Sequence, residues 1–194
     1  VKEKNNRFEF KDLSLSKKYK IKSISKINLN YLDKDSSKNE LSINKKNKNY
    51  LLDSKSFNAR KIIDDLLKSD KNSDSKKIFS NDFKLSVNIK KILLDKDHLI
   101  KDLDGYLTFK DSEVIDANLA GDFSNNQSIN FTIRSNPNEK ITTLYSDVAK
   151  PFVSRYKFIK GFEQGNLDFY SIKQNNVSNS KLIIDNFKVQ EVPA

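Results

Sequence analysis

Several residue types that carry chemistry in enzymes are missing or scarce in this sequence. It has no cysteine and no methionine, and its single histidine is His98. Without cysteine there can be no disulfide, thiolate metal site or cysteine nucleophile, and one histidine leaves little room for a zinc site or a catalytic triad. The four glycines leave hardly any room for a glycine-rich phosphate loop. We therefore expect no enzymatic activity, no metal site and no cofactor.

Long apolar runs are also missing. No window approaches the run of about 18 apolar residues that a membrane span requires, and no basic-then-apolar signal peptide is present. The chain of 194 residues opens on Val1 and has no methionine to initiate it. We expect an internal segment of a longer protein, with any membrane anchor outside this segment.

The formal net charge of +10 comes from lysine, because only four of the 36 basic residues are arginine. Residues 1–100 hold 25 basic and 14 acidic residues, whereas residues 101–194 hold 11 and 12. Surfaces that bind nucleic acid favour arginine, whose planar guanidinium reads phosphates and base edges. Compositional drift and a solvated surface therefore explain the charge better, and we expect no nucleic-acid partner. A weak attraction to anionic lipid head groups stays open.

The dominant hydrophobic period is two, which is typical of β-strands with one wet face. The segment from Phe83 to Ile89 places four apolar residues on one side and three polar residues on the other. Similar alternation recurs around residues 107–109, 115–119, 129–133 and 167–169, and it is noisier before residue 53. The pattern predicts roughly ten strands.

Short polar clusters between these segments predict turns. They lie at residues 33–37, 104–105, 124–126, 136–138 and 174–176. Connections this short favour antiparallel hairpins, because a parallel crossover needs many more residues. The predicted fold is mainly β, a long curved antiparallel meander sheet.

Two segments have a helical pattern instead. At about 58–68, apolar residues follow one helix face, with Asn58 as a candidate N-cap. At about 150–160, Pro151 suits a first turn, and Gly161 suits the end of the helix. Residues 69–77 form a polar linker for which we predict no structure.

Two short amphipathic helices cannot cover both faces of so large a sheet. Either the sheet folds onto itself as a sandwich or barrel, or its apolar face forms an open groove that another molecule fills. From their pattern alone, ordinary core explains the candidate lining residues better than a groove does. They are Phe83, Leu85, Val87, Ile89, Leu107, Phe109, Leu119, Phe131 and Ile133.

Several short motifs follow one another along the chain in a recognisable order. They are Phe57-Asn58-Ala59-Arg60, residues 100–107, residues 117–121, Ser146-Asp147, Gly165-Asn166-Leu167 and residues 182–194. The order and spacing of these motifs resemble the C-terminal region of AsmA-like bacterial envelope proteins of the YhdP type, and the resemblance covers about residues 50–194.

The resemblance implies a non-enzymatic, membrane-anchored lipid carrier in the periplasm of a Gram-negative bacterium. Its β-groove would hold phospholipid acyl chains on their way between the inner and outer membranes, and an anchor outside this segment would hold it to the inner membrane. Within one segment, residues 1–54 would form N-terminal strands, 55–78 a helix and linker, and 79–194 the AsmA-like groove with the second helix. The alternative is a structural or assembly module of the envelope. In that case adjacent segments of the full-length chain would cover its apolar face.

Overall fold

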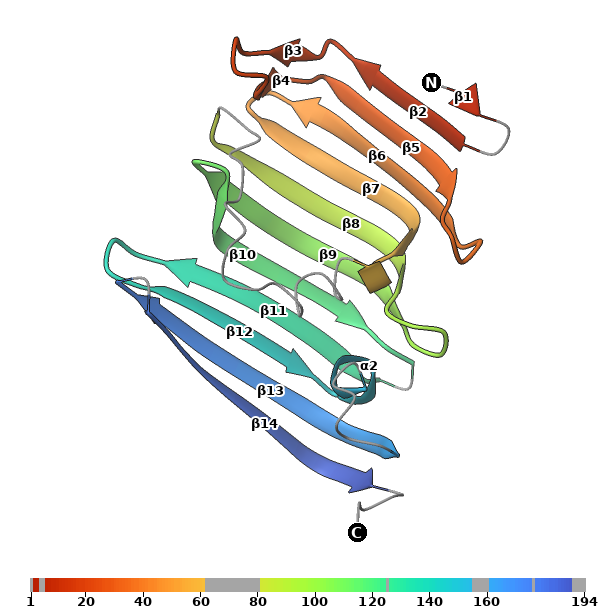
Figure 1. Cartoon of the computed structure of the whole chain (residues 1–194), viewed down its shortest axis with the longest axis vertical. Coiled ribbons are helices and arrows are strands. Elements are labelled where there is room, and N and C mark those ends of the chain that lie inside the picture. The colour runs from red at the N-terminus through yellow and green to blue at the C-terminus, as the bar shows by residue number, and fades with distance from the viewer. Residues whose placement is uncertain are drawn as a thin grey trace.

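The computed structural model describes residues 2–3, 6–61, 81–124, 126–154, 161–175 and 177–189. In this part of the chain, twelve strands form one twisted sheet in the order β1-β2-β5-β6-β7-β8-β9-β10-β11-β12-β13-β14, and β3 pairs with β4 in a separate hairpin (Figure 1). The strands of the N-terminal half are β1 (Lys2–Glu3), β2 (Asn6–Lys11), β3 (Ser14–Leu15), β4 (Ile21–Ser23), β5 (Lys26–Leu32), β6 (Lys38–Lys46) and β7 (Asn49–Asn58). Those of the C-terminal half are β8 (Phe83–Leu93), β9 (Leu99–Lys110), β10 (Glu113–Asp122), β11 (Ser128–Ser135), β12 (Lys140–Ser146), β13 (Phe162–Gln174) and β14 (Val177–Val189).

The predicted mainly-β meander is confirmed, with one exception to the antiparallel pattern. Strands β7 and β8 pair in parallel, with Leu52 opposite Val87. The chain between Asn58 and Phe83 is long enough for the crossover that a parallel pair requires. All other neighbouring strands of the large sheet run antiparallel.

One predicted turn was wrong. Asp104 and Gly105 lie in the middle of strand β9, where Gly105 stands opposite Val87 on one side and Leu119 on the other. A glycine inside a strand marks a close approach of neighbouring backbone as readily as it marks a turn. The turn predicted at 33–37 lies between β5 and β6, and the one at 136–138 lies between β11 and β12.

The two predicted helices fall only partly within the described residues. Strand β7 runs to Asn58, across the boundary expected at residue 54, and the chain is helical at Arg60 and Lys61. The side-chain oxygen of Asn58 accepts the Arg60 backbone N–H at 3.1 Å, as an N-cap would. The rest of that helix and the linker at 69–77 lie outside the described residues.

Helix α2 (Lys150–Val153) begins in the second predicted helical segment, with Pro151 in its first turn. Residues 155–160 of the predicted helix lie outside the described part of the chain. Pro151 and Val153 are buried, and Val153 packs with Phe162 and Leu167 of β13. A larger cluster of buried residues lies on the strands in the middle of the sheet and on the residues that directly follow β8 and β10. It consists of Val87, Ile89, Ile92, Leu94, Ile100, Phe123 and Ile129.

Candidate functional site

One face of the sheet carries an unbroken row of apolar positions, which we call the apolar row. Residues that stand opposite each other on paired strands point to the same side of a sheet, so the register defines the row. It crosses eleven consecutive strands, from β2 to β14, and Gly105 is its only position without a side chain. The row consists of Phe10, Ile27, Ile43, Leu52, Val87, Gly105, Leu119, Phe131, Leu144, Phe169 and Leu182.

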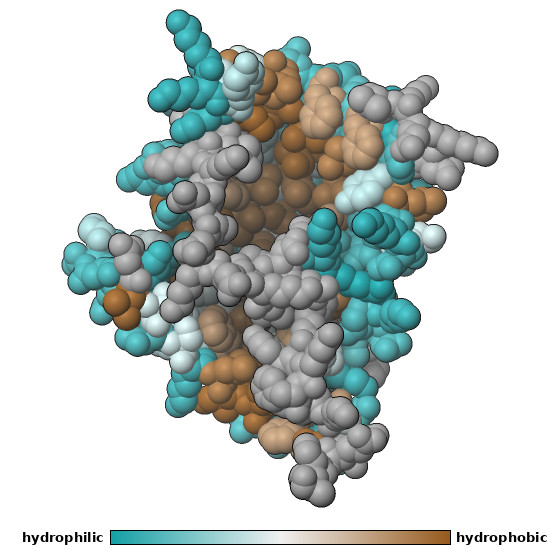
Figure 2. Space-filling model, in the orientation of Figure 1, coloured by the Kyte–Doolittle hydropathy of each residue, from teal (hydrophilic) through white to brown (hydrophobic). Residues whose placement is uncertain are grey.

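Most of the apolar row is only partly covered. Val87 is buried, with 7% of its surface exposed, whereas Phe10 and Leu182 at the two ends are 53% and 47% exposed. The other eight positions are half-buried. Figure 2 shows apolar side chains gathered over this face of the sheet between hydrophilic margins. The face that carries the apolar row, here called the apolar face, is therefore buried at Val87 in its middle and most exposed at its two ends.

Two buried serines on the apolar face donate their hydroxyls to backbone carbonyls. Ser54 and Ser146 occupy the row beside the apolar row, and both are buried. The Ser54 hydroxyl donates to the Glu40 carbonyl at 2.7 Å, and the Ser146 hydroxyl donates to the Val148 carbonyl at 2.9 Å. Because these hydroxyls already have acceptors, they interrupt the apolar surface less than free hydroxyls would.

All nine candidate lining residues lie on the apolar face. Phe83 stands opposite Phe109 and Leu85 opposite Leu107, and the two phenylalanine rings stack with their centroids 4.7 Å apart. Leu119 stands opposite Phe131 in the apolar row. Val87, Ile89 and Ile133 are the buried members of the set, and the other six are half-buried.

Sequence reasoning missed the parts of the apolar row contributed by the outer strands. Ile27, Ile43 and Leu52 extend it through β5, β6 and β7, and Leu144 and Phe169 extend it through β12 and β13. The alternation around 167–169 could have found Phe169. Strand β5 carries the same signal, since Ile27, Leu29 and Tyr31 alternate with polar residues there, and it could have found Ile27.

The opposite face, here called the polar face, is lined by side chains that hydrogen-bond to one another across the strands. The Asn28 amide donates to Glu9 at 3.0 Å, and the Ser42 hydroxyl donates to Asn28 at 2.9 Å. The row that backs the apolar row carries polar groups everywhere except at Ala120 and Ile183. It consists of Glu9, Asn28, Ser42, Asp53, Asn88, Asp104, Ala120, Asn130, Tyr145, Asp168 and Ile183.

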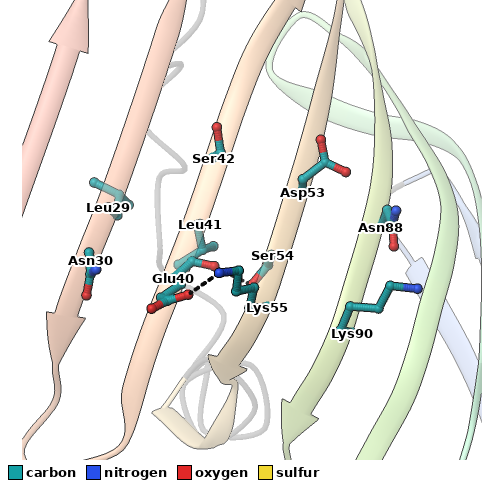
Figure 3. A pocket seen from close by; sticks show the side chains of 10 residues that line it. All are labelled: Leu29, Asn30, Glu40, Leu41, Ser42, Asp53, Ser54, Lys55, Asn88 and Lys90. Atoms are coloured by element: carbon teal, nitrogen blue, oxygen red, sulfur yellow. Dashed lines mark hydrogen bonds and ion pairs between the residues drawn. The ribbon is translucent and has the colours of Figure 1, made fainter.

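A shallow hollow of about 490 Å³ lies across β5 to β8 and is lined mainly by side chains of the polar face (Figure 3). Lys55 lies 3.8 Å from a carboxylate oxygen of Glu40, and Lys90 lies 2.9 Å from Asp102. The hydrogen bond from Lys38 lowers the pKa of Glu40. Since these charges are already paired, the hollow has the character of a solvated surface rather than of an acid–base site.

His98 is half-buried beside Asp95. Its Nδ1 lies 2.8 Å from one Asp95 oxygen, and the backbone N–H groups of Asp97 and His98 also donate to that carboxylate. Burial acts to raise the pKa of Asp95, but the hydrogen bonds from Asp97 and His98 lower it overall. His98 therefore fixes the turn between β8 and β9. Among the described residues, no group of three or more potential metal ligands comes together.

Asp147 gives a pH-dependent contribution to stability. The Tyr145 hydroxyl donates to it at 2.6 Å and the Ser128 N–H at 2.7 Å, and these bonds lower the pKa of Asp147. The pKa of Asp147 is lower in the folded protein than in the unfolded chain. Its contribution to stability is therefore complete at a pH above the unfolded-state pKa, and it is lost as the pH falls through the folded-state pKa. We expect the free energy of unfolding, measured in urea, to decrease when the pH is lowered below about 4. In Asp147→Asn the decrease in the free energy of unfolding at low pH should be smaller than in the unmodified protein. An equal decrease would show that Asp147 does not cause it.

Comparison of the chain with protein-family models, with curated proteins and with solved structures gives no match. In the described residues, no helix has both the length and the hydropathy of a membrane span. The case for function therefore depends on the apolar face, on the polar face behind it, and on the motif resemblance.

Proposed function

We propose that this chain is a non-enzymatic segment of an AsmA-like, YhdP-type lipid carrier. In this proposal the apolar face holds phospholipid acyl chains as they pass between the inner and outer membranes of a Gram-negative envelope. The segment lies in the periplasm, and an anchor outside it attaches the protein to the inner membrane. The single observation that carries the proposal is the apolar row, continuous over eleven strands and backed by polar side chains.

The energetics of lipid transfer favour such a surface. An acyl chain of about 16 carbons exposed to water costs on the order of 12 kcal/mol, at about 0.8 kcal/mol for each CH₂. A continuous apolar path avoids most of that cost at every step. Strands lie about 4.8 Å apart, so the ten steps from β2 to β14 give a path of roughly 48 Å. The accessible ends at Phe10 and Leu182 suit a path that continues beyond the segment.

A structural or assembly module is the second candidate, and the packed middle of the sheet favours it. Val87 and Ile89 are 7% and 6% exposed, as in an ordinary core. In that case adjacent segments of the full-length chain would cover the half-buried positions, and the protein would act through protein contacts alone.

Lipid analysis of the purified segment separates these two functions. We expect organic extraction followed by mass spectrometry to recover phospholipid with the protein. Photo-crosslinking probes placed at Phe131, on the apolar row, should label lipid in cells, whereas probes at Asn130, on the polar face, should not. Lipid-free protein together with equal labelling from both positions would leave only the structural module.

A further inference from the structure

The β3–β4 hairpin stands apart from the large sheet and has an unusual surface. It lies at one corner of the molecule, beyond the ends of β2 and β5 (Figure 1). Residues 13–22, which include it, contain four lysines and no acidic residue. The lysines are Lys17, Lys18, Lys20 and Lys22, and all but Lys20 are exposed. The hairpin therefore concentrates positive charge at one corner.

Apolar side chains are exposed among these lysines. Tyr19 is 85% exposed, Leu13 is 47% exposed and Leu15 is 46% exposed. Exposed apolar surface is unfavourable in water, and here three such side chains lie within seven residues of the chain. Phe10, the exposed end of the apolar row, precedes Leu13 by only three residues. The apolar face and the hairpin therefore expose apolar side chains close together in the sequence.

Hydrogen bonds define the turn of the hairpin that carries Tyr19. The Ser16 N–H donates to the Lys20 carbonyl at 2.8 Å, and the Tyr19 N–H donates to the Ser16 carbonyl at 2.9 Å. The Ser16 hydroxyl accepts the Lys20 N–H at 3.0 Å. These bonds hold Tyr19 at a φ of 58°, a left-handed conformation that bulky residues rarely adopt. The conformation is kept although the ring contributes almost nothing to the core.

We propose that the β3–β4 hairpin docks on a lipid bilayer with anionic head groups. Tyr19, Leu13 and Leu15 enter the head-group region, where an aromatic ring with a polar end and aliphatic side chains both partition favourably. Lys17 and Lys18 contact lipid phosphates, which attract lysines near the membrane surface. The combination fits a bilayer better than a nucleic acid, because exposed leucines gain nothing from phosphate contacts and the hairpin has no arginine.

This inference goes beyond the proposed function, since docking requires no lipid on the apolar face. The two fail separately: lipid extraction reports on the apolar face, whereas vesicle binding by the hairpin reports on docking. Docking would place the Phe10 end of the apolar row next to a membrane.

Vesicle cosedimentation of the 194-residue chain tests the charge requirement. We expect binding to vesicles of phosphatidylcholine with phosphatidylglycerol, and little binding to phosphatidylcholine alone. Lys17→Gln combined with Lys18→Gln should weaken that binding roughly thirtyfold. The control combines Lys34→Gln with Lys96→Gln, two exposed lysines in turns at the other ends of the strands. An equal loss in the control pair would overturn the proposal, because net charge alone would then explain binding.

Tryptophan fluorescence tests insertion, because the chain has no tryptophan of its own. Tyr19→Trp should give a blue-shifted emission when anionic vesicles are added. Leu13→Ser combined with Leu15→Ser should weaken vesicle binding even though Lys17 and Lys18 are retained. Addition of duplex DNA should leave the emission unchanged. Tight DNA binding with no blue shift on vesicles would overturn the proposal in favour of a polyanion surface.

Discussion

Gly105→Ala should destabilise the protein by at least about 3 kcal/mol, a large part of the 5–15 kcal/mol that typically separates folded from unfolded domains. A Cβ at this position would lie 1.9 Å from the carbonyl oxygen of Asn118 and 3.0 Å from the Cα of Leu119. These are backbone atoms of the neighbouring strand, so no side-chain rotation relieves the clash. The backbone φ of 138° adds strain for any residue with a Cβ.

The effect should be visible as a lower midpoint of urea unfolding. Asp104→Ala is the matched control, because Asp104 is the preceding residue and its side chain is exposed on the polar face. Such a surface substitution should change stability by no more than about 0.5 kcal/mol. If both variants unfolded at the same urea concentration, the close approach of β10 to Gly105 would not hold in solution.

Local alternation was sufficient to predict the strands in the middle of the sheet. The segment from Phe83 to Ile89 became β8, and all nine candidate lining residues lie on one face, because a side-chain period of two fixes the face once a strand forms. The turns at 33–37 and 136–138 were equally local, since polar clusters with aspartate, asparagine or proline set the backbone there.

The features that could not be predicted from the sequence depend on pairing between distant segments. The parallel pairing of Leu52 with Val87 requires the crossover after β7, and no local pattern encodes it. The prediction of a turn at Gly105 was wrong for the same reason. Glycine is required there because the Asn118 backbone on the next strand leaves no space for a Cβ. Ser54 is a polar residue on the apolar face, and the backbone carbonyls of Glu40 and Ser56 that accept its hydroxyl explain why it can be buried.

The contrast between the two faces also explains how the sheet tolerates its composition. A lysine-rich chain can still build a continuous apolar surface, because each strand places its apolar side chains on one face and its polar side chains on the other. Strand β5 shows this arrangement: Ile27 and Leu29 lie on the apolar face, and Asn28 between them hydrogen-bonds on the polar face. The apolar face is therefore a property of the register across strands more than of any one segment.

A single carboxylate on the apolar row should block lipid loading if the proposed function is correct. In Phe131→Glu the charge lies between Leu119 and Leu144, on neighbouring strands of the row. An acyl chain crossing this point would have to desolvate an unpaired carboxylate, which costs several kcal/mol. We expect phospholipid recovered with the purified protein to fall at least about a hundredfold.

Two further variants show whether this loss has the proposed cause. Asn130→Glu adds the same charge one residue away, where the side chain is exposed on the polar face, and should leave lipid loading unchanged. Phe131→Ser removes the same ring without adding charge; it should cost stability of about 1.5–3 kcal/mol, through lost burial, but retain most of the lipid. If Phe131→Glu kept its lipid, or if Asn130→Glu lost it to the same extent, the acyl chains would not lie along the apolar row. A carboxylate at position 131 discriminates between the two functions. In a structural module it would lower only the free energy of unfolding, whereas in a lipid carrier it would also lower the amount of bound phospholipid.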